Sequence, residues 1–225
     1  MTTSRRVHSL TAHRDFFIKH GQKVQYPKNQ IFVSPSDPSQ WVYFLVEGMV
    51  KVSFSLRDGS EQIMGYFWPG SVFAQSRSFY ENDGGGLIFQ ALYPSTLYRV
   101  HQKVFFQQLK TSLEFAAEYI QQLQINQIFL VERALYQGEH SVQRRCVRWL
   151  LFMARYYGEP TKQGDRLIMP LTQETVANFL HSSRESAGKT LQALIKDGYI
   201  AITKKRITIK DSAGLKQLLH TPADA

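Results

Sequence analysis

The chain has 225 residues, of which 43% are hydrophobic, and it carries 27 Lys and Arg against 18 Asp and Glu, a formal net charge of +9. This length favours two domains over one, and the single cysteine excludes an internal disulfide and fits a reducing cytosol, so we expect a cytoplasmic location. No stretch approaches the roughly 20 apolar residues of a membrane span and no signal peptide is recognised, so the basic excess indicates a polyanion partner rather than a membrane.

Short apolar runs, separated by turn signals, occupy the chain from about residue 21 to residue 100. Asp58-Gly59, which stands between two such runs, is a strong hairpin signal. Even spacing of this kind predicts an antiparallel sandwich or jelly roll, called the β-roll below. The expected strands lie in GQKVQYPKNQIFV, WVYFLVEGMVKVSFS, RDGSEQIMGYF, PGSVFAQ and GGGLIFQALYPSTLYRV.

From about Gln102 to Gly138 the pattern of short strands gives way to a helical period, with no Gly or Pro before Gly138. Apolar residues three and four positions apart form a seam of roughly four heptads, which predicts that the helices of two copies pair in a homodimer. The alternative is that the seam packs on the chain's own β-roll, although a second stripe (Phe115, Tyr119, Ile128) is available for that contact. The expected seam consists of Leu113, Ala116, Ile120, Leu123, Gln127, Leu130, Ala134 and Gln137.

The next segment, RRCVRWLLFMARYY, is also helical in its pattern. Cys146 lies on its apolar stripe with Leu150 and Met153. A free cysteine in this setting behaves as a small buried hydrophobe, so we expect no redox role for it.

Two short helices are predicted within PLTQETVANFLH and SSRESAGKTLQALIKDGYI. Thr172 is the expected cap of the first helix, Ser182 and Glu185 stand at capping-box spacing at the start of the second, and Gly198 ends it. Because about three residues separate them, the pair forms a helix-turn-helix, whose second helix enters the major groove of DNA. Its polar first turn predicts that Arg184 and Glu185 face bases; an ordinary helical hairpin with a solvated end is the alternative.

The segment YIAITKKRITIKD follows at once. Its alternating isoleucines flank Lys204, Lys205 and Arg206, which predicts a two-stranded wing with a basic tip suited to contacting phosphate. Residues 140 to 225 hold 14 basic and 7 acidic residues, whereas residues 1 to 139 hold 13 and 11. The positive charge is therefore concentrated around the helix-turn-helix, which favours double-stranded DNA as the partner.

Three segments together resemble the Crp/Fnr family of bacterial transcription regulators over nearly the whole chain. YFLVEGMVKVSFSLRDGSEQIMGYFWPGSVF is similar to the family's cyclic-nucleotide-binding-type roll, RRCVRWLLFMA to the helix that opens its DNA-binding domain, and SSRESAGKTLQAL to its recognition helix. The resemblance implies an α+β chain with a β-roll effector-sensing domain at 1–101, a helical region with the long dimerisation helix at 102–138, and a winged helix-turn-helix at 139–225. It also implies an inverted-repeat operator with a half-site like TGTGA, and RNA polymerase as a further partner.

In the family's recognition helix an Arg-Glu pair and a basic residue four positions after the Glu read bases, and these roles fall on Arg184, Glu185 and Lys189. Lys189 replaces the more usual Arg, and a point donor selects less sharply than a bidentate fork. His181 stands where helix-turn-helix proteins often have Gly, and it must adopt a positive φ. The full expected DNA contact set is Thr172, Ser183, Arg184, Glu185, Ser186, Lys189, Lys204, Lys205 and Arg206.

The effector site departs further from the family. Members that bind cyclic AMP use a Gly-Glu pair followed about ten residues later by Arg-Ser, but an ungapped reading from Pro69-Gly70 puts Ala74 and Gln75, then Gly85 and Gly86, at those positions. The carboxylate and the guanidinium that would hold the ribose and the phosphate are both missing, so we expect no cyclic nucleotide. No His or Cys lies between residues 21 and 100, so no haem, metal or other cofactor is expected there.

Aromatic residues are instead frequent in the β-roll, and with a few amides they would suit a small organic effector. In outline this domain resembles the chlorophenol-sensing branch of dehalogenation regulators, which place a Lys on the long helix near the ligand oxygen. Asn126 stands at that place here, and a neutral amide does not favour a phenolate. The expected effector contacts are Tyr66, Trp68, Phe73, Gln75, Tyr80, Phe89, Gln90, Leu123, Asn126 and Gln127.

Two other functions stay open at this point. A DNA-binding regulator that needs no ligand fits the same pattern, with a β-roll that has no cavity. An enzyme on the β-roll fits less well, because we find no close carboxylate pair with an obvious role, no Ser-His-Asp order and no nucleophile motif. If an effector acts, Gly138, in the sequence GEH, is the expected hinge into the DNA-binding domain.

Overall fold

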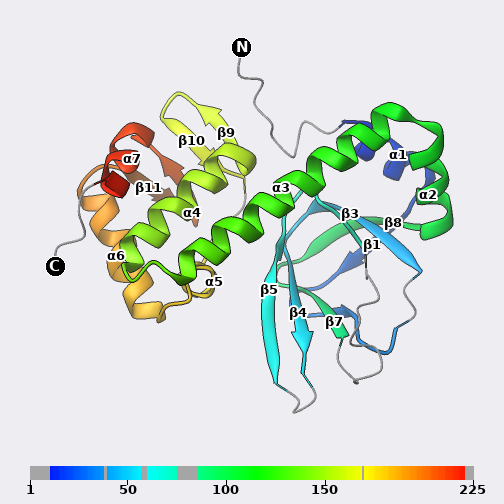
Figure 1. Cartoon of the computed structure of the whole chain (residues 1–225), viewed down its shortest axis with the longest axis horizontal. Coiled ribbons are helices and arrows are strands. Elements are labelled where there is room, and N and C mark those ends of the chain that lie inside the picture. The colour runs from blue at the N-terminus through cyan, green and yellow to red at the C-terminus, as the bar shows by residue number, and fades with distance from the viewer. Residues whose placement is uncertain (1–10, 38–39, 57–59, 75–85, 169, 221–225) are drawn as a thin grey trace. The chain divides into compact units, whose positions relative to one another are not determined.

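The computed structural model describes residues 11–37, 40–56, 60–74, 86–168 and 170–220 (Figure 1). It divides into two compact units, an N-terminal unit of Val7–Leu123 and a C-terminal unit whose main segment is Gln124–Ala225. The boundary falls inside the long helix, so each unit contains a portion of that helix. The division into three domains at 101/102 and 138/139 stays a prediction.

Strands dominate the N-terminal unit, as their alternating patterns predict. Among the described residues they form two four-stranded antiparallel sheets, in the orders β1-β8-β3-β6 and β2-β7-β4-β5. The expected hairpin pairs Ser55 of β4 with Glu61 of β5, although Asp58-Gly59 itself lies outside the described residues. The elements are α1 (Thr11–His20), β1 (Gln22–Tyr26), β2 (Ile31–Val33), β3 (Trp41–Glu47), β4 (Val50–Ser55), β5 (Glu61–Phe67), β6 (Val72–Ala74), β7 (Gly86–Ala91) and β8 (Ser95–His101).

Alternation along the strands sends one set of side chains between the two sheets and another set outward. Strands of both sheets contribute to the inner core, whose buried members are Val33, Tyr43, Leu45, Val50, Phe73, Phe89 and Leu97. The opposite face of the first sheet, with Val42 and Phe44 of β3, packs against helices that carry Phe17, Phe105 and Phe115. The β-roll therefore has a packed interior and one sheet face covered by helices.

The helical region is two helices rather than one: α2 (Gln102–Thr111) and α3 (Leu113–Gln137). Ser112 separates them because it adopts an extended conformation (φ −128°, ψ 108°) and its hydroxyl accepts from the amide of Phe115. A serine in this role caps the following helix, so the helical period continues across a real break. The helix α3 ends at Gln137, immediately before Gly138.

Helix α1 is fastened to α3 by polar contacts. The amides of Ala12 and His13 donate to the Glu118 carboxylate at 3.2 and 3.0 Å, so an acidic side chain stands at the N-terminal end of α1, where the helix dipole favours it. The His13 ring nitrogen Nε2 lies 3.1 Å from the Phe115 carbonyl. Burial lowers the pKa of His13, although Glu118 and the bond to Phe115 oppose that shift.

The C-terminal unit contains the predicted helix-turn-helix and wing. Its described strands form an antiparallel sheet in the order β11-β12-β10-β9. Hairpin β9–β10 and helix α7 were not predicted, because their strands of four residues and a helix of nine carry little periodic signal. The elements are α4 (Val142–Tyr157), β9 (Gly158–Thr161), β10 (Gly164–Leu167), α5 (Gln173–Leu180), α6 (Arg184–Lys196), β11 (Ile200–Thr203), β12 (Arg206–Ile209) and α7 (Ser212–His220).

Helix α4 supplies much of the core of this unit, with Trp149, Leu150 and Met153 each at most 1% exposed. Cys146 is fully buried on the same helix, and burial raises the pKa of its thiol to about 12. The burial of Cys146 confirms its interpretation as a small hydrophobe, and the raised pKa keeps the thiol protonated near neutral pH. Among the described residues no helix is both long enough and apolar enough to cross a membrane.

Candidate nucleic-acid interface

The turn between α5 and α6 has the geometry of a helix-turn-helix. Thr172 caps α5, since its hydroxyl accepts from the Thr175 amide at 3.1 Å, as predicted. His181 then takes the left-handed conformation, with φ 47° and ψ 50°, in the place where Gly was the more usual residue. The next amide, of Ser182, donates back to the Ala177 carbonyl at 3.0 Å and closes the end of α5.

The predicted capping box of Ser182 and Glu185 is wrong. Ser183 caps α6 instead, and its hydroxyl accepts from the Ser186 amide at 3.1 Å. The physical reason is the preceding turn: the Ser182 amide bonds the Ala177 carbonyl at the end of α5, so Ser182 belongs to the end of that helix and the cap of α6 falls on the next residue. The Glu185 carboxylate pairs with the Lys189 ammonium one turn later, at 2.7 Å.

Helix α6 divides sharply into a buried face and an exposed face. Ala187, Leu191 and Leu194 are 0 to 3% exposed and fix the helix on the core. The side chains of Lys189 and Glu185 are 77% and 75% exposed, and Arg184 and Ser183 are exposed as well. The first two turns therefore present one cation-rich polar surface to solvent, while Ser186 is half-buried beside the cap.

The wing ends in a tight turn with a basic tip. Thr203 pairs with Arg206 across the hairpin, and the two residues between them, Lys204 and Lys205, have φ of 49° and 64°. Positive φ at both positions is the signature of a type I′ turn, which matches the twist of the strands. All three basic residues of the tip are exposed, as predicted for a phosphate-contacting wing.

One backbone contact brings this tip to the start of the helix-turn-helix. The Leu171 amide donates to the Lys205 carbonyl at 2.7 Å, directly before Thr172. The predicted residues at the start of α5 and in the wing therefore share one region of the unit. The Thr172 hydroxyl also lies 2.8 Å from the Thr175 hydroxyl, so its established contacts are structural and its DNA contact stays a prediction.

The predicted effector residues of the β-roll lie in a different setting. Tyr66, Trp68, Phe73 and Phe89 are 0 to 7% exposed. The rings of Phe73 and Phe67 are parallel with centroids 4.1 Å apart, and Phe89 meets Phe73 edge-on at 5.2 Å. The rings of Phe67, Phe73 and Phe89 pack between the sheets, so their packing role is established, and the ligand role of all the predicted residues stays a prediction.

The remaining expected effector residues are dispersed. Gln90 donates to the Asn29 carbonyl at 3.0 Å, and Leu123 is 47% exposed. Asn126 and Gln127 belong to the C-terminal unit, where the first is half-buried and the second exposed. Gln75 and Tyr80 lie outside the described residues.

Sequence reasoning missed Gln122, a polar residue with an unusual environment. It is 1% exposed, and its amide nitrogen donates to the Val72 carbonyl at 3.1 Å. That bond fixes the orientation of the amide, and the opposite atom, Oε1, is buried without a hydrogen-bond partner among the residues that the structure describes. A buried acceptor without a donor is unfavourable by about 1–3 kcal/mol, so it is a candidate ligand contact.

The predicted dimer seam is exposed on α3. Leu113, Ile120 and Leu130 are 88%, 57% and 55% exposed, and Leu123 belongs to the same stripe. Ala134 and Gln127 are exposed and Ala116 is half-buried, whereas nothing is described for the side chain of Gln137. Of the second stripe, Phe115 is buried and Tyr119 packs beside it, whereas Ile128 is 38% exposed and its contact with the β-roll stays a prediction.

Two domain families match the chain. Residues 23–112 match the cyclic nucleotide-binding domain, and residues 144–218 match the Crp-like helix-turn-helix domain. The first match covers β1 to α2, and the second covers α4 to most of α7.

Two curated relatives match over both domains. The chain is 27% identical over 201 residues to the Global nitrogen regulator of Synechocystis sp., which covers 85% of this chain and 86% of the relative. It is 26% identical over 202 residues to the CRP-like protein Clp of Xanthomonas euvesicatoria pv. vesicatoria, covering 86% of each.

Solved structures share the arrangement at lower identity. A CooA variant from Carboxydothermus hydrogenoformans has a TM-score of 0.69 at 19% identity, over 90% of this chain and 89% of that one. FixK2 from Bradyrhizobium japonicum gives 0.65 at 18%, over 91% and 99%, and CprK complexed with OCPA gives 0.65 at 16%, over 90% and 92%. At these identities the likeness shows the fold alone, and the predicted α+β architecture of β-roll, long helix and winged helix-turn-helix is confirmed.

Proposed function

The chain belongs to the Crp/Fnr family of transcription regulators, and from that premise we propose that it binds an inverted-repeat operator as a homodimer through the exposed end of α6. Regulators of this family bind DNA and act as dimers. The observation that carries the proposal is the polar surface of Arg184, Glu185 and Lys189, which lies outside the buried face of a capped helix.

Two side chains of that surface have a chemical counterpart in the major groove. The Arg184 fork matches the two acceptors of a guanine, and the Glu185 carboxylate matches a cytosine amine. Because Lys189 pairs with Glu185 in the free protein, it neutralises a carboxylate that would otherwise repel DNA. Phosphate contacts fall to Lys204, Lys205 and Arg206 in the wing and to Thr172, with Ser183 and Ser186 holding the helix start.

The exposed seam of α3 supports the dimer. A row of large apolar side chains on the surface of one copy is unfavourable in water, and burial between two helices removes it. A two-fold dimer places its two reading helices in successive major grooves, about 34 Å apart. The operator is then an inverted repeat, with half-sites close to TGTGA.

For the effector we infer a small organic molecule other than cyclic AMP. Ala74 and Gln75 stand where the family's cyclic AMP binders have Gly-Glu, which removes the carboxylate that a ribose needs. Among the described residues nothing donates to the Oε1 atom of Gln122, which supports a ligand that carries a hydroxyl or N–H donor. A chlorinated phenol remains one candidate, and the contribution of Asn126 stays a prediction.

A regulator that needs no ligand is the second candidate. It is favoured by the stacked rings of Phe67, Phe73 and Phe89, which already occupy the interior of the β-roll. The two candidates differ in one observable, since only an effector-controlled regulator changes operator affinity when a small molecule binds.

The DNA proposal is tested by titrating labelled upstream DNA with the parent protein and with Arg184→Ala, using fluorescence anisotropy. We expect the substitution to weaken operator binding by about 1–3 kcal/mol and to relax selectivity at one base pair. Arg155→Ala is the matched control, because Arg155 is an exposed arginine of α4 that stacks over Tyr156 and is not among the predicted DNA contacts. Unchanged operator binding by Arg184→Ala would show that α6 is not the reader.

The effector proposal is tested by a thermal-shift screen of small phenols, anilines and nucleotides. A ligand of the folded state raises the melting temperature with its occupancy. We expect a neutral donor compound to stabilise the parent and to lose that effect in Gln122→Leu. If no compound shifts the parent and none alters its operator affinity, the ligand-independent candidate is the correct one.

A further inference from the structure

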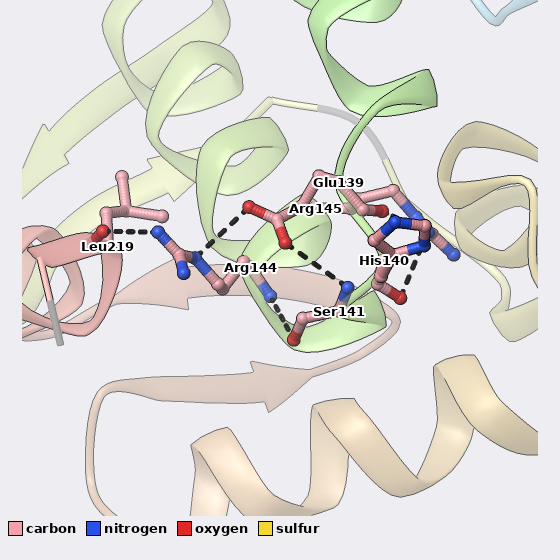
Figure 2. Close-up of polar contacts among 6 residues, drawn as sticks. All are labelled: Glu139, His140, Ser141, Arg144, Arg145 and Leu219. Atoms are coloured by element: carbon pink, nitrogen blue, oxygen red, sulfur yellow. Dashed lines mark hydrogen bonds and ion pairs between the residues drawn. The ribbon is translucent and has the colours of Figure 1, made fainter. Parts of the chain in front are cut away.

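A short linker joins the end of α3 to α4, and its glycine has no special geometry. Gly138 does not have a positive φ, and a Cβ atom added to it would meet only the Leu135 carbonyl oxygen, at an ordinary 3.8 Å. Any residue could therefore occupy this position. The polar contacts of the linker come from the residues after Gly138, which Figure 2 shows as sticks.

Glu139 ties the linker to the first turn of α4. Its carboxylate lies 3.1 Å from Nε of Arg144, an ion pair that lacks hydrogen-bond geometry, and it accepts from the Ser141 amide at 3.3 Å. The two side chains are 23% (Arg144) and 18% (Glu139) exposed. By contrast, the Arg166–Glu159 pair of the β9–β10 hairpin is 3.4 Å long and almost half exposed, so solvent screens it more strongly.

Arg144 extends this contact to the last helix of the chain (Figure 2). Its Nη2 donates to the Leu219 carbonyl at 2.8 Å, in the last turn of α7. Carbonyls in a last helical turn have no partner within the helix and carry partial negative charge, so a guanidinium stabilises them. One guanidinium therefore pairs with the carboxylate by charge through Nε and donates a hydrogen bond to the carbonyl through Nη2.

Two further contacts hold the same region. Nη1 of Arg145 donates to the Glu139 carbonyl at 2.6 Å, so the linker backbone is bonded as well as its side chain. On α3, the Phe129 ring lies 5.4 Å from the Phe152 ring and 6.3 Å from the Phe179 ring. These aromatic contacts pack the C-terminal half of α3 against α4 and against the first helix of the helix-turn-helix.

We propose that Arg144, held by Glu139 and the Leu219 carbonyl, is a positioning residue that fixes the helix-turn-helix relative to the C-terminal half of α3. We call these three groups the Arg144 clasp. With the clasp closed, the linker does not swivel at Gly138, and α3 from Gln124 onward turns together with the DNA-binding helices. This departs from the expected hinge at Gly138.

The clasp should affect the affinity for an operator with two half-sites, and not the affinity for a single half-site. The proposal rests on the proposed function, in which two copies of α6 engage an inverted repeat together. A fixed angle between α3 and α6 sets the separation of the two reading helices, so loosening the angle weakens the second contact of the pair. Loosening this angle does not change the contact of a single α6 with a single half-site.

The test compares DNA containing the full inverted repeat with DNA containing a single half-site. We expect Arg144→Gln to lower full-site affinity on the order of tenfold while half-site affinity stays the same. The full-site affinity of Arg144→Lys should lie between those of the parent and Arg144→Gln, because an ammonium does not contact both partners as a guanidinium does. Gly138→Ala, which stiffens the expected hinge, and Arg166→Gln, which removes the exposed pair, should leave both affinities unchanged.

Hydrogen exchange gives a readout that does not involve DNA. The Ser141 amide should exchange slowly in the parent and faster in Glu139→Gln, a milder change that serves if Arg144→Gln does not fold. An unprotected Ser141 amide in the parent, or an unchanged ratio of full-site to half-site affinity in the Arg144 and Glu139 variants, would overturn the clasp. Arg184→Ala must lower both affinities; if it lowers neither, the proposed function is wrong instead.

Discussion

The two units of this chain use their chemically distinctive residues in opposite ways. In the C-terminal unit, Arg184 and Lys189 project from a helix whose other face is buried. In the N-terminal unit, Phe73 and Phe89 fill the space between two sheets. The proposed DNA interface is thus a surface added to a finished core, whereas Phe73 and Phe89 belong to the core itself, so a ligand there must replace contacts that already stabilise the fold.

The largest expected effect follows from the packing of the β-roll. Phe89→Ala should destabilise the N-terminal unit by about 3–5 kcal/mol, because a fully buried ring that contacts Phe67 and Phe73 is removed. Arg184→Ala, by comparison, should change the free energy of unfolding by no more than about 0.5 kcal/mol. Denaturant unfolding measures both. A loss near zero for Phe89→Ala would mean that the ring borders a cavity rather than a packed core.

A second prediction concerns the seam that runs along α3 through both units. Leu123→Glu should produce monomers, because like charges would meet where two apolar stripes pair. Affinity for the full inverted repeat should fall by about a hundredfold as the second half-site contact is lost. Light scattering and anisotropy measure the two effects. Gln124→Glu, a neighbouring exposed change off the seam, should keep the dimer, and a monomeric parent at micromolar concentration would contradict the assignment.

A smaller effect is expected at the wing. Lys205→Ala removes one phosphate contact, so it should weaken binding to every DNA sequence alike and reduce the slope of log K against log salt by about 1. Alanine at this position should also destabilise the turn, because Lys205 has a positive φ of 64°. Lys205→Asn, which accepts that conformation more readily, is the cleaner variant. Loss of selectivity at one base pair would instead identify Lys205 as a base reader.

The smallest expected effect is a pH dependence in the N-terminal unit. Because the folded protein keeps the pKa of His13 below its ordinary value of 6.5, only the unfolded chain takes up a proton as pH falls past that value. The contribution of His13 to stability is therefore fully present above pH 6.5 and declines as the pH falls below that value. His13→Gln should flatten this decline, and Glu118→Gln should separate the contribution of the nearby carboxylate. Equal pH profiles for the parent and His13→Gln would contradict the argument.

Much of the C-terminal unit could be predicted because its signals are local. The Thr172 cap, the left-handed His181 and the Lys204–Lys205 turn each depend on residues within a few positions of one another. The error at Ser182 was also local, since two neighbouring serines could each have capped α6, and only the closing turn of α5 decided between them.

Contacts between distant residues could not be predicted in the same way. Phe67, Phe73 and Phe89 were visible as an aromatic-rich stretch, but their stacking depends on the register of separate strands. Gln122 meets Val72 across 50 positions, and Arg144 meets Leu219 across 75. No period or motif connects such pairs, so the Gln122–Val72 bond and the Arg144–Leu219 bond are evident only in the folded chain.

We infer that the C-terminal unit binds operator DNA and that the β-roll does not recognise a cyclic nucleotide. The most direct test titrates labelled operator DNA with the parent protein, with and without saturating cyclic AMP, by fluorescence anisotropy. The account predicts that cyclic AMP changes the operator Kd by less than about twofold, because no carboxylate or guanidinium stands at the positions that would hold it. A tightening of tenfold or more, about 1.4 kcal/mol of coupling, would contradict it.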